Sequence, residues 1–206
     1  MNTKISLSTL LLMVGLMLSQ AQENSDNTFK QLTDQILIDA PVVQVWNVLS
    51  RFQDVGEIHP LIEESVALGK RSEEIEVGLQ REIMIPRGMI NTIYKQEVMS
   101  FVPFERLELQ VYKAENIPIR TMNISYEIIP HGQDQTLLQR VSSYDLKSNW
   151  LNHRWKHRLE DANFEDLLAY KYFIETAGLK AEAKVLKVWY SKQNKNRKAD
   201  DLVVSN

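Results

Sequence analysis

The sequence contains no cysteine among its 206 residues. Thiol catalysis, thiolate metal sites and disulfides are therefore excluded, and a fold of this size must be held together by burial of its core. An excess of basic charge is also missing, because 24 Lys and Arg residues stand against 27 Asp and Glu residues, a formal net charge of −3. Since a nucleic-acid-binding surface needs positive charge, we expect no nucleic-acid partner.

Several motifs that are typical of catalytic centres are absent as well. The sequence has no Gly-rich phosphate loop, no G-x-S-x-G elbow and no H-E-x-x-H motif. His153 and His157 lie four residues apart, a spacing at which two imidazoles on a helix can share a metal ion, but no acidic third ligand follows at a zincin-like spacing. We predict no metal site and no cofactor, and a solvated basic face at these histidines.

A long hydrophobic run occurs only near the N-terminus, where residues 5–18 follow Lys4. Ser19 and Ala21 are the small residues expected at positions −3 and −1 of a cleavage site, so residues 1–21 are predicted to be a signal peptide cleaved after Ala21. The run is too short and wrongly flanked for a stable membrane span, although an uncleaved anchor is the alternative. We expect a periplasmic or secreted protein without a membrane span after cleavage.

The remaining sequence predicts one α+β domain, residues 35–190, between a flexible segment, 22–34, and a disordered tail, 191–206. An apolar run at 35–40 predicts a strand, and Val42, Val45 and Trp46 recur at helical spacing. A long C-terminal helix follows Trp150, and it either ends near Gly178 or continues to about residue 189. Between the helices, alternating runs predict strands at 64–70, 74–77, 79–85, 90–101, 105–113, 120–129 and 136–146.

Certain motifs, taken in order, resemble the SRPBCC superfamily, which has the START-like helix-grip fold. They are "ILIDAPVVQVWNVLSRFQDVGEIHPLI", then Gly78 and Arg81, then Glu97, then a "P..RL" turn at residues 103–107. The nearest branch is that of polyketide cyclases/dehydrases and lipid-transport proteins. The resemblance implies a curved antiparallel sheet of about six to seven strands wrapped around the long C-terminal helix. His59 departs from the family pattern, in which a Trp is common before the Pro.

A cavity between the sheet and that helix is also implied by the resemblance, with the "VGEIHPLI" segment as a wall or lid. We expect a volume of several hundred Å³, as is typical of small-ligand sites. The ligand would be apolar: a lipid, a sterol or a polyketide-like molecule. The residues predicted to contact it are Trp46, Phe52, His59, Pro60, Arg81, Tyr94, Glu97, Tyr112, Phe164, Leu168 and Tyr172.

Two of these residues are candidates for acid/base chemistry. His59 could exchange a proton at the cavity mouth, or it could be a turn histidine bonded to backbone or water. Glu97 shares strand parity with Ile93 and Phe101, which would point it inward toward a partner such as Arg81 or Arg140, but it could also lie on the wet face.

Three functions follow from these observations. The first is an exported protein that binds a small apolar ligand, and this is the function we adopt. The second is a cyclase or dehydratase that uses His59 or Glu97 as acid or base. The third is a periplasmic interaction module in which the 147–163 segment, near Trp150 and Trp155, meets a protein partner.

Overall fold

The structure, a computed structural model, describes residues 29–191 of the chain. The predicted signal peptide, residues 1–21, lies outside the described residues, as do residues 192–206 of the predicted tail. The strands are β1 (Lys30–Ile38), β2 (Glu64–Leu68), β3 (Gln80–Arg87), β4 (Ile90–Val102), β5 (Arg106–Glu115), β6 (Ile119–His131) and β7 (Gln135–Leu146). The helices are α2 (Val42–Leu49), α3 (Val55–Ile58) and α4 (Asn152–Glu175), with the 3₁₀ turns η1 (Phe52–Asp54) and η2 (Asn149–Leu151), and residues 183–191 are helical too.

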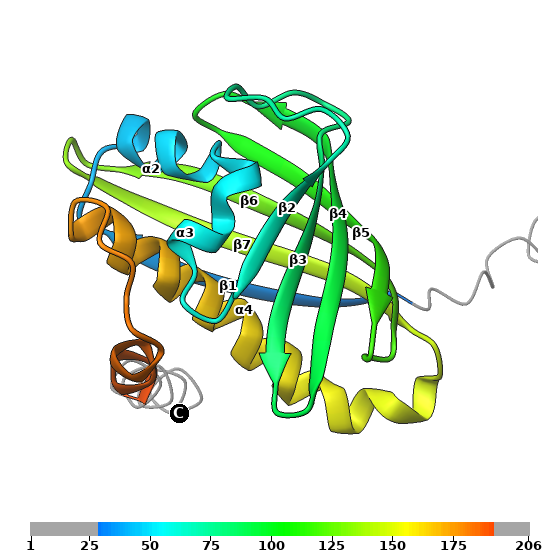
Figure 1. Cartoon of the computed structure of the whole chain (residues 1–206). Helices are drawn as coiled ribbons and strands as arrows, with labels where there is room; N and C mark the ends of the chain where they lie inside the picture. Colours follow the sequence, from blue (N-terminus) through cyan, green and yellow to red (C-terminus); the bar gives the residue numbers. More distant parts are fainter. Residues whose placement is uncertain (1–28, 192–206) are drawn as a thin grey trace, which may run out of the picture.

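The strands form one antiparallel sheet in the order β1-β7-β6-β5-β4-β3-β2. β2 to β7 run as a meander of sequential neighbours, and β1 returns to pair with β7, from Lys30 opposite Tyr144 to Ile38 opposite Thr136. The sheet curls, and the long helix α4 lies along it, packed against β1 and β7 (Figure 1). This confirms the predicted α+β helix-grip architecture.

Two strands differ from the sequence prediction: one is longer than expected and one is absent. β1 begins at Lys30, so residues 30–34, which were expected to be flexible, extend the strand along β7. Leu32 and Asp34 alternate with exposed neighbours and are buried, which explains the longer pairing. The strand predicted at 74–77 is absent: these residues form bends and turns, and the Lys70 ammonium pairs with Glu76 at 2.9 Å across that loop.

The C-terminal helix follows the shorter of the two alternatives. α4 ends at Glu175, ahead of Gly178, which has a left-handed φ of 91°. The Gly178 N–H donates to the Phe173 carbonyl at 2.8 Å, so a carbonyl of the last helical turn keeps a partner. The chain then turns before the separate helical residues 183–191.

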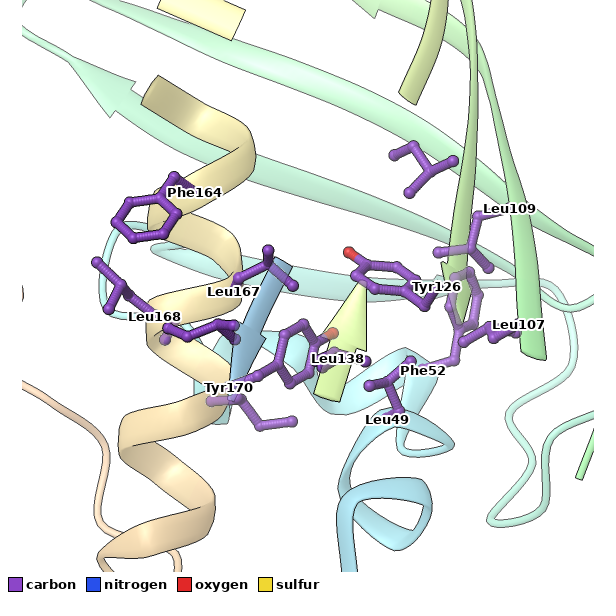
Figure 2. Close-up of a cluster of buried hydrophobic side chains, with 14 of the residues drawn as sticks. Leu49, Phe52, Leu107, Leu109, Tyr126, Leu138, Phe164, Leu167, Leu168 and Tyr170 are labelled. Carbon is purple, nitrogen blue, oxygen red and sulfur yellow. The ribbon is translucent and has the colours of Figure 1, made fainter. Parts of the chain in front are cut away.

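At the end of the sheet near α2 the interior is filled. Leu49 of α2, Leu138 of β7 and Leu167 of α4 are each at most 1% exposed and belong to one apolar cluster (Figure 2). Leu167 points toward Tyr126 of the sheet, whereas Phe164 lies on the opposite side of α4 (Figure 2). That second side is covered by the C-terminal segment, because the Phe164 and Tyr190 rings meet edge to face at 5.8 Å.

Candidate ligand-binding site

A cavity of about 110 Å³ remains between the sheet and α4, away from the filled end. Its volume is below the several hundred Å³ expected from the sequence. A dry cavity of about 150 Å³ holds one benzene molecule, so this space is somewhat smaller than one that holds a single ring. Its apolar wall is formed by Val55, Leu61, Ile62, Ile83, Ile85, Val111, Met122, Ile124 and Leu159.

The segment after α2 forms one wall of this cavity. α3 is only four residues long, and the chain then turns back, with the His59 N–H donating to the Val55 carbonyl and the Ile62 N–H to the His59 carbonyl. The turn directs Val55, His59 and Ile62 toward the cavity. A continuous helix would place these three residues on one stripe but turn Leu61 away from it, so the irregular backbone adds Leu61 to the same wall.

A polar cluster centred on Asp166 of α4 occupies the same cavity. The Tyr126 hydroxyl donates to Asp166 Oδ2 at 2.6 Å, and Arg140 Nη1 lies 3.2 Å from the same oxygen. The side chains of Arg140 and Asp166 are only 10% and 15% exposed. The carboxylate therefore compensates the buried guanidinium, and Asp166 Oδ1 is left facing His59, whose Nε2 is 4.0 Å away.

His59 is buried and neutral near pH 7. Its pKa is lowered to about 4, first because burial disfavours the charged ring and then because Arg140, Lys180 and Arg81 are nearby, while Asp166 opposes the shift. Nδ1 accepts the Leu61 N–H at 3.2 Å, so the ring proton is on Nε2. His59 thus offers the cavity a hydrogen-bond donor, and its basic nitrogen is occupied by backbone.

Two other donors in the cavity have no partner within the described residues. Arg140 Nε and Asn163 Nδ2 are buried and unpaired, although Asn163 Oδ1 accepts a hydrogen bond from Ser142 at 2.9 Å. A buried donor without a partner costs about 1–3 kcal/mol. Both residues line the cavity, so its wall contains two buried donors without an acceptor among the described residues.

Arg81 of β3 lines the cavity, but most of its hydrogen bonds are made to other residues of the protein. Its Nε donates to Gln96 Oε1 at 2.8 Å, and Nη1 donates to the Phe52 carbonyl. The guanidinium also lies over the Phe52 ring, 4.2 Å from its centroid. Arg81 therefore fixes η1 to the sheet while adding positive charge to the cavity wall.

Of the residues predicted to contact the ligand, His59, Arg81 and Tyr94 line the cavity, and Pro60 lies in a groove at its mouth. The Tyr94 hydroxyl is in a buried environment, and burial raises its pKa. These four come from the α3 turn, β3 and β4, which the fold brings to one end of the sheet.

Five of the predicted residues lie elsewhere in the interior. Trp46 and Phe52 belong to the filled core, and the Trp46 ring packs against Phe101 at 6.1 Å. Phe164, Leu168 and Tyr172 lie away from the cavity; the Tyr172 and Trp189 rings meet at 5.3 Å. Four of these side chains are buried and Tyr172 is half-buried, but α4 has two covered sides and only one of them faces the cavity.

Glu97 and Tyr112 are on the outer face of the sheet, so the wet-face alternative for Glu97 is the one observed. Gln80 bonds to both, donating to Glu97 Oε2 at 3.0 Å and accepting from the Tyr112 hydroxyl at 3.2 Å. The register of β4 on β5 shifts between Val98 and Ser100. This irregularity exchanges the two faces of β4, so Phe101 points inward while Glu97 does not.

The polar cluster itself was missed, apart from His59 and Arg81. Asp166 and Asn163 were not selected, and Arg140 was named only as a partner for Glu97. A signal was present: Asn163, Asp166 and Tyr170 repeat at helical spacing with buried apolar residues, and Arg140 alternates with buried Leu138 along β7. Polar residues that recur among buried apolar residues on one face of a helix or strand indicate a polar cluster in the interior.

No group of three or more His, Asp or Glu residues arranged to hold a metal ion occurs within residues 29–191. His157 Nδ1 instead lies 3.0 Å from Glu160 Oε2, and His153 is exposed. Trp150 is 76% exposed, whereas Trp155 packs against the core. Among the helices in this part of the chain, none is long and apolar enough to cross a membrane.

No protein-family model and no curated protein matches the sequence. Solved structures do match. A START superfamily protein from Mycobacterium smegmatis is 15% identical, with 71% of this chain and 98% of that chain covered and a TM-score of 0.60. The Zhui aromatase/cyclase from Streptomyces sp. R1128 is 12% identical, with 71% and 94% covered and a TM-score of 0.62.

Norcoclaurine synthase from Thalictrum flavum, solved in complex with dopamine and hydroxybenzaldehyde, is 13% identical, with 74% of this chain and 92% of that chain covered and a TM-score of 0.59. At such identities the likeness concerns the fold and not the function. Each of the three alignments covers more than nine-tenths of the neighbour and more than two-thirds of this chain. The chain therefore has the START-like helix-grip fold that its sequence motifs predicted.

Proposed function

We propose that this protein is an exported binding protein for a small, mainly apolar ligand that carries a hydrogen-bond-accepting oxygen. The observation that supports it best is the pair of buried, unpaired donors, Arg140 Nε and Asn163 Nδ2, on residues that line a cavity with both apolar and polar walls. A ligand oxygen that accepts from either donor recovers the cost of about 1–3 kcal/mol of that unpaired donor. A ligand without such an oxygen recovers neither cost.

The volume of the cavity narrows the ligand class. At about 110 Å³ the cavity is close to the space that one ring needs, whereas a sterol or a lipid with two acyl chains needs much more space. Of the lipid, sterol and polyketide-like classes, the aromatic, polyketide-like class fits best, with one ring inside. The oxygen would be a carbonyl or a hydroxyl, because Asp166 already supplies a negative charge beside Arg140.

The test is a matched pair of ligands. Acetophenone has one ring and a carbonyl oxygen, and α-methylstyrene has the same shape with a CH₂ group in place of that oxygen. We expect acetophenone to bind at least about tenfold more tightly, because a site built to hydrogen-bond rejects an analogue that lacks the acceptor. The measurement is an NMR titration that follows the Asn163 side-chain amide and the methyl groups of Ile83 and Ile124.

Shifts confined to residues outside the cavity, or no binding of either compound, would contradict the proposal. Equal binding of both would retain an apolar site and reject recognition of the oxygen. Native mass spectrometry of protein purified from its own periplasm then identifies the natural ligand class. Export is tested by N-terminal sequencing of that protein, which should begin at Gln22.

Catalysis is the second candidate function, and it is favoured by the position of Asp166. Asp166 Oδ2 is held by Tyr126 and Arg140, while Oδ1 faces the cavity, so the carboxylate is oriented as a base would be. It could remove a proton from the carbon next to a ligand carbonyl, with the electron pair moving to the carbonyl oxygen and the N–H donors of Arg140 and Asn163 stabilising it. Cyclase and dehydratase reactions use such a step.

Exchange of the acetophenone methyl protons in D₂O tests this second function. An enzyme should accelerate the exchange above the buffer rate, and Asp166→Asn should abolish the acceleration. Glu97→Gln, on the outer face, is the matched control and should exchange like the wild type. If bound acetophenone exchanges no faster than free acetophenone, the binding function stands alone.

A further inference from the structure

A groove of about 530 Å³ adjoins the cavity at its mouth. We call it the vestibule: it is lined by residues 60–63, residues 85–87 and three residues between 180 and 187. Leu61, Ile62, Ile85 and Arg87 line both the vestibule and the cavity, so the two spaces meet along these side chains. A molecule with its ring in the cavity would extend from there into the vestibule.

The vestibule carries a local excess of positive charge. Arg87, Lys180 and Lys187 line it, against one carboxylate, Glu63. This contrasts with the whole chain, which has a net charge of −3. Lys180 is also fixed in place, because its ammonium donates to the Gly56 carbonyl of α3 at 2.6 Å. A cation held by backbone in this way is preorganised and loses less side-chain entropy when it binds an anion.

These cations act at the boundary between the two spaces. The charge of Lys180 contributes to the lowered pKa of His59 inside the cavity, after burial and alongside Arg140. Glu165, which lines the cavity, has a pKa raised by burial and by Asp161, and both Lys187 and Arg87 oppose that rise. The Glu165 carboxylate is thus a second acidic group near the mouth, beside Glu63, and two cations of the vestibule lie near enough to offset its charge.

The inner end of the cavity is a poor place for an anionic group. There the Asp166 carboxylate already accepts from Tyr126 and pairs with Arg140. A second carboxylate would lie beside the first in a site of low dielectric, where like charges repel strongly. An anionic ligand group is therefore favoured at the vestibule and a neutral oxygen at the inner end.

We propose that the vestibule binds the anionic group of the ligand whose ring occupies the cavity, so that the ligand class is an aromatic ketone or phenol bearing a carboxylate on a short chain. This rests on the proposed binding function and adds a second subsite to it. Arg87 and Lys187 contact the carboxylate from opposite sides of the mouth, β3 and the C-terminal helical residues, and Lys180 adds charge from the connecting segment.

Benzoylpropionate, its methyl ester and acetophenone form the test series. All three share the ring and the ketone, and only the first carries a carboxylate. We expect the wild type to bind benzoylpropionate about tenfold more tightly than the ester at low ionic strength, with most of that advantage lost in high salt because the vestibule is open to solvent. Calorimetry or NMR titration gives the dissociation constants.

The variant Arg87→Gln with Lys187→Gln should bring the acid and the ester to within about twofold of each other, since both facing cations are removed. Lys184→Gln is the control for the Lys187→Gln half of this variant: it removes one positive charge one turn away, on an exposed side chain outside the vestibule. This control should bind benzoylpropionate more tightly than the methyl ester by nearly the same factor as the wild type does. Acetophenone should bind the wild type and all variants alike.

The outcomes separate the two proposals. If acetophenone does not bind the wild type, the cavity function itself fails. If acetophenone binds and the acid has no advantage over the ester, the cavity function stands and the vestibule subsite is rejected. Equal loss of the advantage in the Lys184→Gln control would also reject the subsite, because it would show an effect of overall charge.

Discussion

The two ends of the space between the sheet and α4 differ in what fills them. Near α2 the helix contributes Leu49 to a core in which Leu138 and Leu167 leave no room. Near α3 the covering element is one turn long, and the inward positions hold Arg140 and Asp166. The same sheet face and the same helix thus carry a packed core at one end and a polar-lined cavity at the other.

This comparison shows that a cavity in this fold depends on two things together. The short α3 leaves space, because four residues supply less apolar surface than the eight of α2. The charged side chains preserve the space, because a paired guanidinium and carboxylate need their hydrogen-bonding geometry and resist collapse of the wall. Stability is concentrated at one end and binding chemistry at the other.

The largest effect should come from the filled end. Leu167→Ala should lower the free energy of unfolding by about 4 kcal/mol, because a fully buried leucine is lost and the packed surroundings close only partly. Ile85→Ala, at the half-buried cavity mouth, should cost about 1 kcal/mol or less. Urea denaturation measures both, and similar losses would contradict the contrast between the ends.

Breaking the ion pair is next in size. Asp166→Asn should cost about 3 kcal/mol, because Arg140 remains buried without an anion. The double variant Asp166→Leu with Arg140→Met should change stability by about 1 kcal/mol or less, since it removes both charges. Equilibrium unfolding of the single and double variants is the measurement. A double variant as unstable as the single one would show that the pair is needed for folding.

The pH dependence of stability should depend on His59. The folded-state pKa of about 4 lies below the ordinary 6.5, so between these values the unfolded chain binds the extra proton and stability falls as the pH is lowered. From pH 7 to about pH 5 this group should account for about 2 kcal/mol of lost stability. His59→Gln should remove that part, seen in urea titrations at both pH values. An unchanged slope would contradict the neutral buried imidazole.

The smallest change in stability is expected at the cavity, when an alanine of α4 is replaced by leucine at each of the two ends. Ala162→Leu fills the cavity from α4 and should alter stability by about 1 kcal/mol or less while weakening acetophenone binding at least about tenfold. Ala169→Leu, two turns along the same helix, enters the packed core and should cost about 2 kcal/mol by overpacking. Unfolding curves measure the stability of both variants, and an NMR titration measures acetophenone binding. An equal loss of stability in the two variants would mean that the cavity is not open space.

Prediction from sequence succeeded where local pattern decides structure. The helical spacing of Val45, Trp46 and Leu49 predicts α2, and alternation predicts most of the strands. It failed where strand pairing or a local irregularity determines the length of a strand or the face on which a side chain lies. β1 is longer than predicted because β7 offers partners as far as Tyr144, and the shift beside Val98 reverses the faces of β4. Neither cause is visible in a single segment of sequence.

The candidate site was partly predicted for the same reason. His59, Arg81 and Tyr94 were found because each belongs to a motif or to a short strand near the expected cavity. Asp166 and Asn163 come from a helix more than 100 positions further along, and only packing brings them to His59. Their roles depend on distances between elements, which no local pattern contains.

The sequence by itself determined the α+β order of elements and the position of the long helix, because hydrophobic periodicity acts within a segment. The resemblance of its motifs added the helix-grip architecture. Only the tertiary structure decided which face of β4 and which side of α4 meet the cavity. It also decided how large that cavity is, and that Arg140 and Asn163 each keep an unpaired N–H donor. These properties arise from contacts between distant segments, and they are the ones that decide binding.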